Sequence, residues 1–296
     1  MLSAKPAGQL KLGLLLFAIL IPPAWAETES RDNLVITASR VERPALETFD
    51  NIAQLDTTAI EITAAIHPHQ VAVRLPGVWI SRGSGQEHLT AIRSAVLTGP
   101  GSCGAFLILE DGIPTRPTGF CNVNQLFEIP TALASEIEVI RGPANALYGS
   151  NALHGTFNTI LPDPGTGPAN RVAVEAGSNH YWRANLGWDS GEAEKSYNAG
   201  FVADRDGGFR DDTGYDQIKA FGKMRNELAG GILTLSASGS WLDQETAGFI
   251  TGIDAYKDPE VRFSNPNPEA FRKATSQRLS ATWTPAQDGR WDKEYR

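Results

Sequence analysis

Beyond residue 165 the chain alternates apolar and polar residues with a period of two, the pattern of β-strands that have one buried face. In the clearest segment one face carries Trp182, Ala184, Leu186 and Trp188, and the other carries Arg183, Asn185, Gly187 and Asp189. At least six such segments follow one another with no helical pattern between them. Residues 165–296 are therefore predicted to form an antiparallel, all-β domain.

Two features favour a membrane β-barrel over a soluble β-sandwich for this domain. Trp182 and Trp188 lie six residues apart on one face, which is about 20 Å along a strand and close to the ~25 Å apolar band between the aromatic girdles of an outer-membrane barrel. Short turns, such as residues 177–179, also alternate with long polar connections at 204–214 and 244–273. A sandwich with half-buried strands would show the same alternation, so periodicity alone leaves both folds open.

The first 26 residues have the three regions of a secretory signal peptide. Lys5 and Lys11 precede the apolar residues 12–21, and the small residues Ala24 and Ala26 occupy the positions that a signal peptidase reads. We predict cleavage after Ala26, with an uncleaved anchor or a lipoprotein as the alternatives. No apolar run reaches the roughly 18 residues that a membrane-spanning helix needs, so any membrane crossing would use strands.

Export also governs the interpretation of the two cysteines, Cys103 and Cys121. An oxidising compartment allows them to bond, and a disulfide that closes a loop of this size contributes about 3 kcal/mol in the chain-entropy model. We predict the disulfide, with two free thiols as the alternative.

Several function classes are disfavoured by composition and motifs. The 26 basic residues are outnumbered by 34 acidic ones, whereas nucleic-acid binding needs a clustered positive face. No Ser, Cys or metal constellation has catalytic spacing, so we expect no enzymatic activity and no cofactor. His67 and His69 suggest a metal site only weakly, because no third ligand stands at suitable spacing.

The chain divides at a Pro/Gly cluster near residues 161–165. We expect a polar arm over 27–50 and a compact α+β domain over 51–162, before the β domain of 165–296. Within the α+β domain the pattern predicts a helix over 67–75, strands over 78–81, 89–93, 105–110 and 136–141, and a turn at 111–114.

Residues 136–152, with the sequence EIEVIRGPANALYGSNA, form the most specific stretch in the chain. They read as a strand, a Gly-Pro turn and one helical turn, with a return strand over 156–160. This stretch resembles the signature of the plug domain of TonB-dependent outer-membrane receptors. Residues 75–78, 92–93 and 109–114 agree with that family in order and spacing. The heptapeptide Asp32-Asn33-Leu34-Val35-Ile36-Thr37-Ala38 resembles its TonB box. Ser94, His154, Phe157 and Thr159 depart from the family pattern and indicate a divergent subgroup.

The resemblance implies a plug domain inside a transmembrane barrel, in the outer membrane of a Gram-negative bacterium and with the arm in the periplasm. It implies that Arg93, Glu138 and Arg141 form an ion-pair network, partly with barrel carboxylates, that holds the plug; ordinary solvated strand-end charge is the alternative. The loop of Arg82, Gly83, Ser84 and Gly85 is a candidate for the ligand side. Family barrels have about 22 strands, so we expect this chain to supply the first six to eight, as an N-terminal portion or a natural truncation.

The leading functional hypothesis is a receptor that imports a scarce ligand with energy delivered by TonB. A ferric siderophore is the first candidate, and cobalamin, haem or a glycan are the others. The alternative is a soluble periplasmic binding or adhesive module with a β-sandwich, which extraction without detergent would distinguish. A secreted hydrolase is a weaker third hypothesis, because the catalytic motifs are missing.

Overall fold

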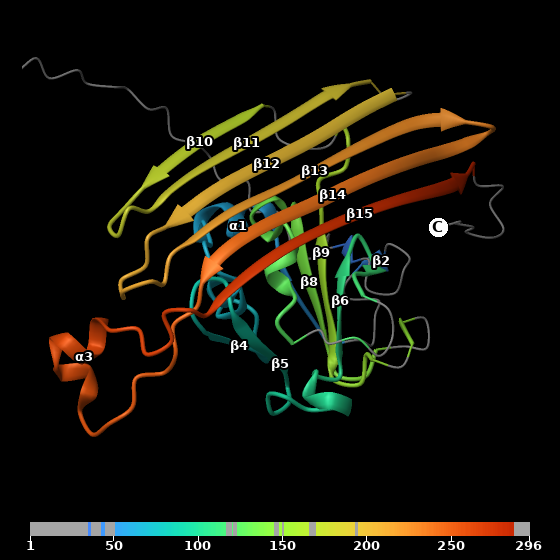
Figure 1. The fold of residues 1–296 in the computed structure, drawn as a ribbon. Helices are drawn as coiled ribbons and strands as arrows, with labels where there is room; N and C mark the ends of the chain where they lie inside the picture. The colour runs from blue at the N-terminus through green and yellow to red at the C-terminus, as the bar shows by residue number, and fades with distance from the viewer. Residues whose placement is uncertain are drawn as a thin grey trace, which may run out of the picture.

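The computed structural model describes residues 35–36, 43–44, 51–116, 120, 123–144, 148–149, 151–165, 170–192 and 195–286. In these ranges an α+β domain lies beneath a curved sheet of six long strands (Figure 1). Each helix in the described part of the chain is too short or too polar to cross a bilayer. The predicted signal peptide lies outside the described residues.

The α+β domain is built on a five-stranded sheet with the order β3-β8-β9-β6-β7. The strands are β3 (Ile52–Leu55), β6 (Phe106–Glu110), β7 (Ile113–Pro114), β8 (Glu136–Arg141) and β9 (Gly155–Ile160). Strands β6 and β9 run parallel, and the other neighbours are antiparallel. Gly155 begins β9 with φ +149°, and a Cβ there would lie 2.1 Å from the Ile140 carbonyl oxygen. Only glycine permits β8 and β9 to approach this closely.

A hairpin and two short helices cover one face of this sheet. The hairpin pairs β4 (Val78–Arg82) with β5 (His88–Ile92), so both predicted strands are confirmed within one residue. The predicted helix is shorter than expected: α2 spans Pro68–Ala72, because the following turn tightens to i→i+3 hydrogen bonds. The sequence analysis missed α1 (Thr57–Thr63), which begins where Asp56 caps the Ala59 amide at 2.7 Å.

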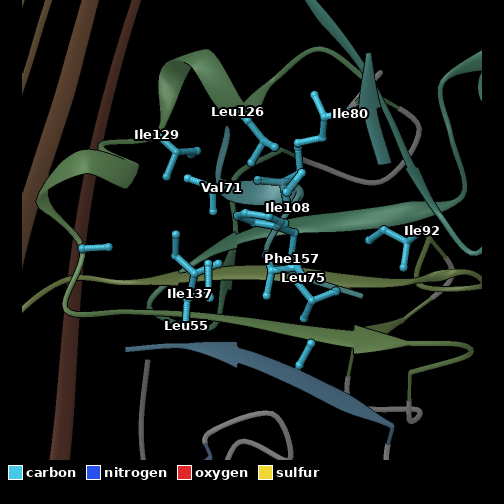
Figure 2. Packing of buried hydrophobic residues seen from close by; sticks show 14 of the residues in the cluster. Leu55, Val71, Leu75, Ile80, Ile92, Ile108, Leu126, Ile129, Ile137 and Phe157 are labelled. Carbon is cyan, nitrogen blue, oxygen red and sulfur yellow. The ribbon is translucent and has the colours of Figure 1, made fainter. Parts of the chain in front are cut away.

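The core of the α+β domain lies between the sheet and these covering elements. Phe157 and Ile108 come from adjacent strands and meet Leu75 and Val71 from the helical side (Figure 2). The labelled members of the cluster are Leu55, Val71, Leu75, Ile80, Ile92, Ile108, Leu126, Ile129, Ile137 and Phe157. Burial of these side chains stabilises the domain by about 1.5–3 kcal/mol for each large one.

The second part of the chain is an antiparallel sheet in which each strand pairs with the next along the sequence. Its strands are β10 (Arg171–Ala176), β11 (Trp182–Gly191), β12 (Lys195–Asp206), β13 (Tyr215–Leu228), β14 (Gly231–Glu245) and β15 (Phe271–Pro285). The prediction of at least six successive strands is confirmed, and the described sheet is not closed. The connection between β14 and β15, residues 246–270, carries the short helix α3 (Pro259–Phe263).

The polarity of this sheet distinguishes the two predicted folds. Trp182, Leu186 and Trp188 are exposed on the outer face, whereas Arg183 and Asn185 on the inner face are buried. A β-sandwich buries apolar side chains between its sheets. An apolar outer face with a polar interior is instead the arrangement of a transmembrane barrel wall. The structure therefore favours the barrel over the sandwich.

Candidate functional site

The α+β domain is joined to the long-stranded sheet by ion pairs and hydrogen bonds and by two small apolar clusters, in which Leu133, Leu161 and Phe127 meet Val202, Phe221, Tyr215 and Leu242 of the sheet. One latch is formed by Lys223 of β13, whose Nζ lies 3.0 Å from Asp111 Oδ1 and 3.2 Å from Asp163 Oδ1. The same ammonium donates to the Leu161 carbonyl oxygen at 2.6 Å. Asp111 occupies the turn between β6 and β7 with φ +50°, next to Gly112, and this turn matches the predicted one. Burial raises the pKa of the Asp111 carboxyl, and Lys223 opposes that rise.

A second latch is formed by Arg278 of β15. Its Nε lies 3.4 Å from Glu110 Oε2, and its Nη2 donates to the Glu128 carbonyl oxygen at 2.8 Å. Glu128 ends the 3₁₀-helix Leu126–Glu128, and Glu110 ends β6. Ser238 of β14 also donates to Glu110 Oε1. Burial raises the pKa of Glu110, while Arg278 and Ser238 favour its ionised form. A carboxylate buried to this extent needs these partners to remain charged.

The ion pairs that join the two described parts share one polarity. The sheet supplies the basic residue and the α+β domain or the segment after it supplies the acidic one, as in Arg272 with Glu87 at 2.9 Å and Arg171 with Glu61 at 2.6 Å. The sequence analysis expected plug arginines to meet barrel carboxylates. The described seam has the opposite arrangement, and its residues were missed because they carry no motif of their own.

The structure brings together two of the three residues predicted to form a network. A Cβ at Gly77 would lie 3.3 Å from Arg93 Cγ and 3.1 Å from Arg141 Cδ, so both arginines flank this glycine. Arg141 donates from Nη1 to the Pro76 carbonyl oxygen at 2.8 Å. Burial, and then the neighbouring charge of Arg93, lowers the pKa of Arg141.

Glu138 does not join the two arginines, which corrects the predicted trio. Positions 138 and 141 are three residues apart on one strand, so their side chains lie on opposite faces of the sheet. Glu138 is buried in register with Gln54 and Asn158. Glu136 lies two residues away on the same face of β8 and accepts a hydrogen bond from Gln54 Nε2. Burial first, and then the charge of Glu138, raises the pKa of Glu136 to about 8.

The predicted ligand-side loop lies at the end of the sheet that carries the long connections. Ser84 Oγ lies 3.2 Å from both the carbonyl oxygen and the amide nitrogen of Ala247, which is in the connection 246–270. The Gln86 amide donates to Gln244 Oε1 at 2.9 Å. Arg82 and Gly83 are exposed. The loop therefore borders the connection that the barrel hypothesis places outside the cell.

A cluster of three histidines stands behind this loop. His67 Nδ1 accepts from the His69 amide at 3.1 Å and caps α2, and His67 Nε2 lies 3.1 Å from the Glu87 carbonyl oxygen. The ring of His88 packs edge-on against His67 with centroids 5.8 Å apart. Burial lowers the pKa of His67 to about 2 and that of His88 to about 4. Within the described ranges, no group of three or more His, Cys, Asp or Glu residues has the geometry to hold a metal.

Two predicted features fall mostly or partly outside the described residues. In the heptapeptide of residues 32–38, only Val35–Ile36 is described, as strand β1 paired antiparallel with β2 (Arg43–Pro44). Cys121 lies outside the described ranges, so the disulfide with Cys103 stays a prediction.

Comparisons with known proteins agree on one family. Residues 44–156 match the model of the TonB-dependent Receptor Plug Domain. The chain is 29% identical over 209 residues to the vitamin B12 transporter BtuB of Vibrio vulnificus (strain CMCP6), a match that covers 69% of this chain and 32% of that protein. It thus spans about a third of that relative's length.

Solved structures share the fold at low sequence identity. FpvA of P. aeruginosa, bound to a heterologous pyoverdine, matches with a TM-score of 0.70 at 17% identity, over 88% of this chain and 35% of that one. The ferric-catecholate import receptor Fiu from E. coli K12 matches with a TM-score of 0.62 at 15% identity, over 83% and 38% of the two chains. The order of an α+β domain followed by a barrel wall is therefore common to these proteins and this chain.

Proposed function

Because this chain belongs to the TonB-dependent outer-membrane receptor family, we propose that it takes part in TonB-energised uptake of a scarce ligand across the outer membrane. The observation that carries the proposal is the seam between the plug, residues 51–165, and the barrel wall. It combines polar contacts such as those of Lys223 and Arg278 with two small, separate apolar clusters, and no continuous apolar core joins the two parts in the described residues. Polar contacts can be exchanged for contacts with water at small net cost, so a plug held this way can move without unfolding the wall.

We propose a ferric siderophore as the ligand, with cobalamin, haem or a glycan as alternatives. Three kinds of cargo appear in the names of the similar proteins: vitamin B12, ferric chelates such as ferric pyoverdine and ferric catecholates, and copper. In this chain the ligand would meet the loop 82–85 and the connections of residues 207–214 and 246–270. Phe249 and Ile253 are almost fully exposed on the second connection, and exposed apolar groups of this kind are common at binding surfaces.

The arm would deliver the pulling force by binding TonB. Residues 32–38 would add a strand to the C-terminal domain of TonB in the periplasm, where backbone hydrogen bonds supply affinity and alternate side chains supply register. The extended, paired backbone of Val35–Ile36 supports a strand conformation for this segment. Because those two residues already pair with Arg43–Pro44, TonB would have to use the other edge or displace this pairing.

We retain Arg93 and Arg141 as part of the proposed plug lock. Two adjacent guanidinium groups repel each other, so a carboxylate placed between them would be strongly favoured. That carboxylate would come from the barrel wall, as the family resemblance implies. Glu138 is left out of this lock because it lies on the opposite face of β8.

Uptake of labelled ligands by cells with and without TonB tests the proposal. Replacing Ile36 by Pro in the intact receptor removes a backbone donor and fixes φ. We expect uptake to be abolished while binding at the cell surface is unchanged, and Val35→Ala to weaken uptake only partly. Uptake unaffected by Ile36→Pro would remove the coupling role from this segment. Extraction of the protein without detergent would instead support the soluble binding module.

A further inference from the structure

We propose that Gln244 and Ser84 form a clasp through which the ligand-side loop of residues 82–85, with the adjoining Gln86 and Glu87, and the connection of residues 246–270 move as one unit. This inference rests on the proposed function only in taking this end of the molecule as the side that ligand reaches. The clasp joins residues about 160 positions apart in the sequence, one from the plug and one from the wall.

Gln244, which belongs to the barrel wall, fixes the position of the loop. Its side chain is 1% exposed near the end of β14, and its Oε1 accepts from the Gln86 amide at 2.9 Å. Gly85 passes directly over the same oxygen with φ +54°, and a Cβ there would lie 2.7 Å from it. A side chain at position 85 would have to displace the Gln244 carboxamide, and the positive φ independently favours glycine there.

Ser84 holds the connection from the plug. Its hydroxyl donates to the Ala247 carbonyl oxygen and accepts from the Ala247 amide, both at 3.2 Å. At the other end of the connection, Arg272 Nη2 lies 2.9 Å from Glu87 Oε1. The loop is therefore tied to both ends of the connection.

Hydrogen bonds to neighbouring segments hold the connection of residues 246–270 in place. A displacement of its exposed residues is therefore passed on to the contacts of the clasp. Arg210, from residues 207–214, donates to the Gly248 carbonyl oxygen at 2.9 Å and to the Ser264 carbonyl oxygen at 2.7 Å. The Thr246 amide donates to the Ala270 carbonyl oxygen at 2.8 Å and closes the base of the connection. A contact made at the exposed Phe249 is thus two residues from the Ala247 anchor.

On the plug side the clasp continues to the start of α2. Gln86 Nε2 donates to the Ile66 carbonyl oxygen at 2.8 Å. The Glu87 carbonyl oxygen lies 3.1 Å from Nε2 of His67, the residue that caps α2. Movement of the loop therefore changes two hydrogen bonds of Ile66 and His67, the residues that lead into this helix.

Amide hydrogen exchange of the full chain in detergent, with no ligand and no TonB, tests the clasp in both directions. Ser84→Ala on the plug should raise exchange roughly five-fold in the wall segment 245–250, the change expected from losing one hydrogen bond of average net strength. Gln244→Met on the wall should raise exchange by a similar factor in the plug segment 66–73. Lys273→Ala is the matched control, since it removes an exposed 2.8 Å pair with Asp243 at the same end of the sheet. It should change neither segment.

The decisive result is a change in amide exchange at residues beyond those that make the substituted contact. Exchange that changes only at residues 84–86 and 247, with segments 66–73 and 248–250 unaffected, would overturn the clasp. If Gln244→Met does not fold, Ser84→Ala alone decides, because it removes only one half-buried hydroxyl. Uptake plays no part in this readout, so a failed clasp leaves the uptake proposal intact, and failed uptake leaves the clasp to be judged by exchange.

Discussion

The histidine cluster should make the plug lose stability as the pH falls, and His67→Asn should remove about half of that loss. His67 and His88 have folded pKa values of about 2 and about 4, against 6.5 when unfolded. Below pH 6.5 the unfolded chain therefore binds protons that the folded chain does not, so stability is full above that pH and decreases below it. The decrease from His88 levels off near pH 4, and that from His67 continues to about pH 2.

The magnitude follows from these pKa values. At pH 5 an unfolded histidine with a pKa of 6.5 is stabilised by protonation by about 2 kcal/mol, and neither folded histidine recovers more than a small part of it. Together the two residues should lower the free energy of unfolding by about 4 kcal/mol when the pH falls from 8 to 5. This corresponds to a roughly 10³-fold fall in amide protection.

The substitution is chosen so that the helix cap survives. An asparagine at position 67 keeps an oxygen that can accept from the His69 amide, and asparagine is among the preferred N-cap residues. The protection lost in segment 66–75 between pH 8 and pH 5 should then fall to about 30-fold, or about 2 kcal/mol. His180→Asn is the control, because His180 is an exposed histidine in the turn between β10 and β11 and has no part in the cluster.

The measurement is amide exchange of segment 66–75 at pH 5, 6, 7 and 8, corrected for the intrinsic exchange rate at each pH. Carboxylates elsewhere titrate in both proteins, so they cancel in the comparison of wild type with His67→Asn. An unchanged pH dependence in the variant would refute the reasoning. It would mean that His67 is solvated or already protonated in the folded plug.

Two further predictions concern Glu136 and the two cysteines. Glu136, with a folded pKa of about 8, is favoured in its neutral form, so the plug should lose stability as the pH rises from 4.5 to 8. Glu136→Gln should remove that loss and raise the urea midpoint at pH 8 without changing it at pH 4; an equal midpoint at pH 8 would contradict the raised pKa. Cys103 and Cys121 should resist alkylation without reductant in periplasmically matured protein, and modification of both thiols in peptide mass mapping would contradict the disulfide.

Local and periodic features of the fold were predictable from the sequence. Period-two alternation is enough to identify strands, so the β11 segment around Trp182 and Leu186 was assigned correctly together with its two faces. Asp111 and Gly112 marked the tight turn that the structure contains. The helix α1 was missed because its start depends on a single capping carboxylate, Asp56, and its seven residues are too few for a clear helical period. The error in the arginine network was avoidable, since the odd spacing of Glu138 and Arg141 already places them on opposite faces.

What the sequence by itself determined is therefore the class of each segment, the order of the domains and the family resemblance. Only the tertiary structure decided which face of the long sheet is buried, because alternation has the same period whether the inner face is polar or apolar. The tertiary structure also decided which residues form the seam between the plug and the wall. Lys223 and Asp111 stand 112 positions apart, and Gln244 and Gln86 stand 158 apart. Contacts over such separations arise from the packing of whole elements, and no local pattern in a single chain encodes them.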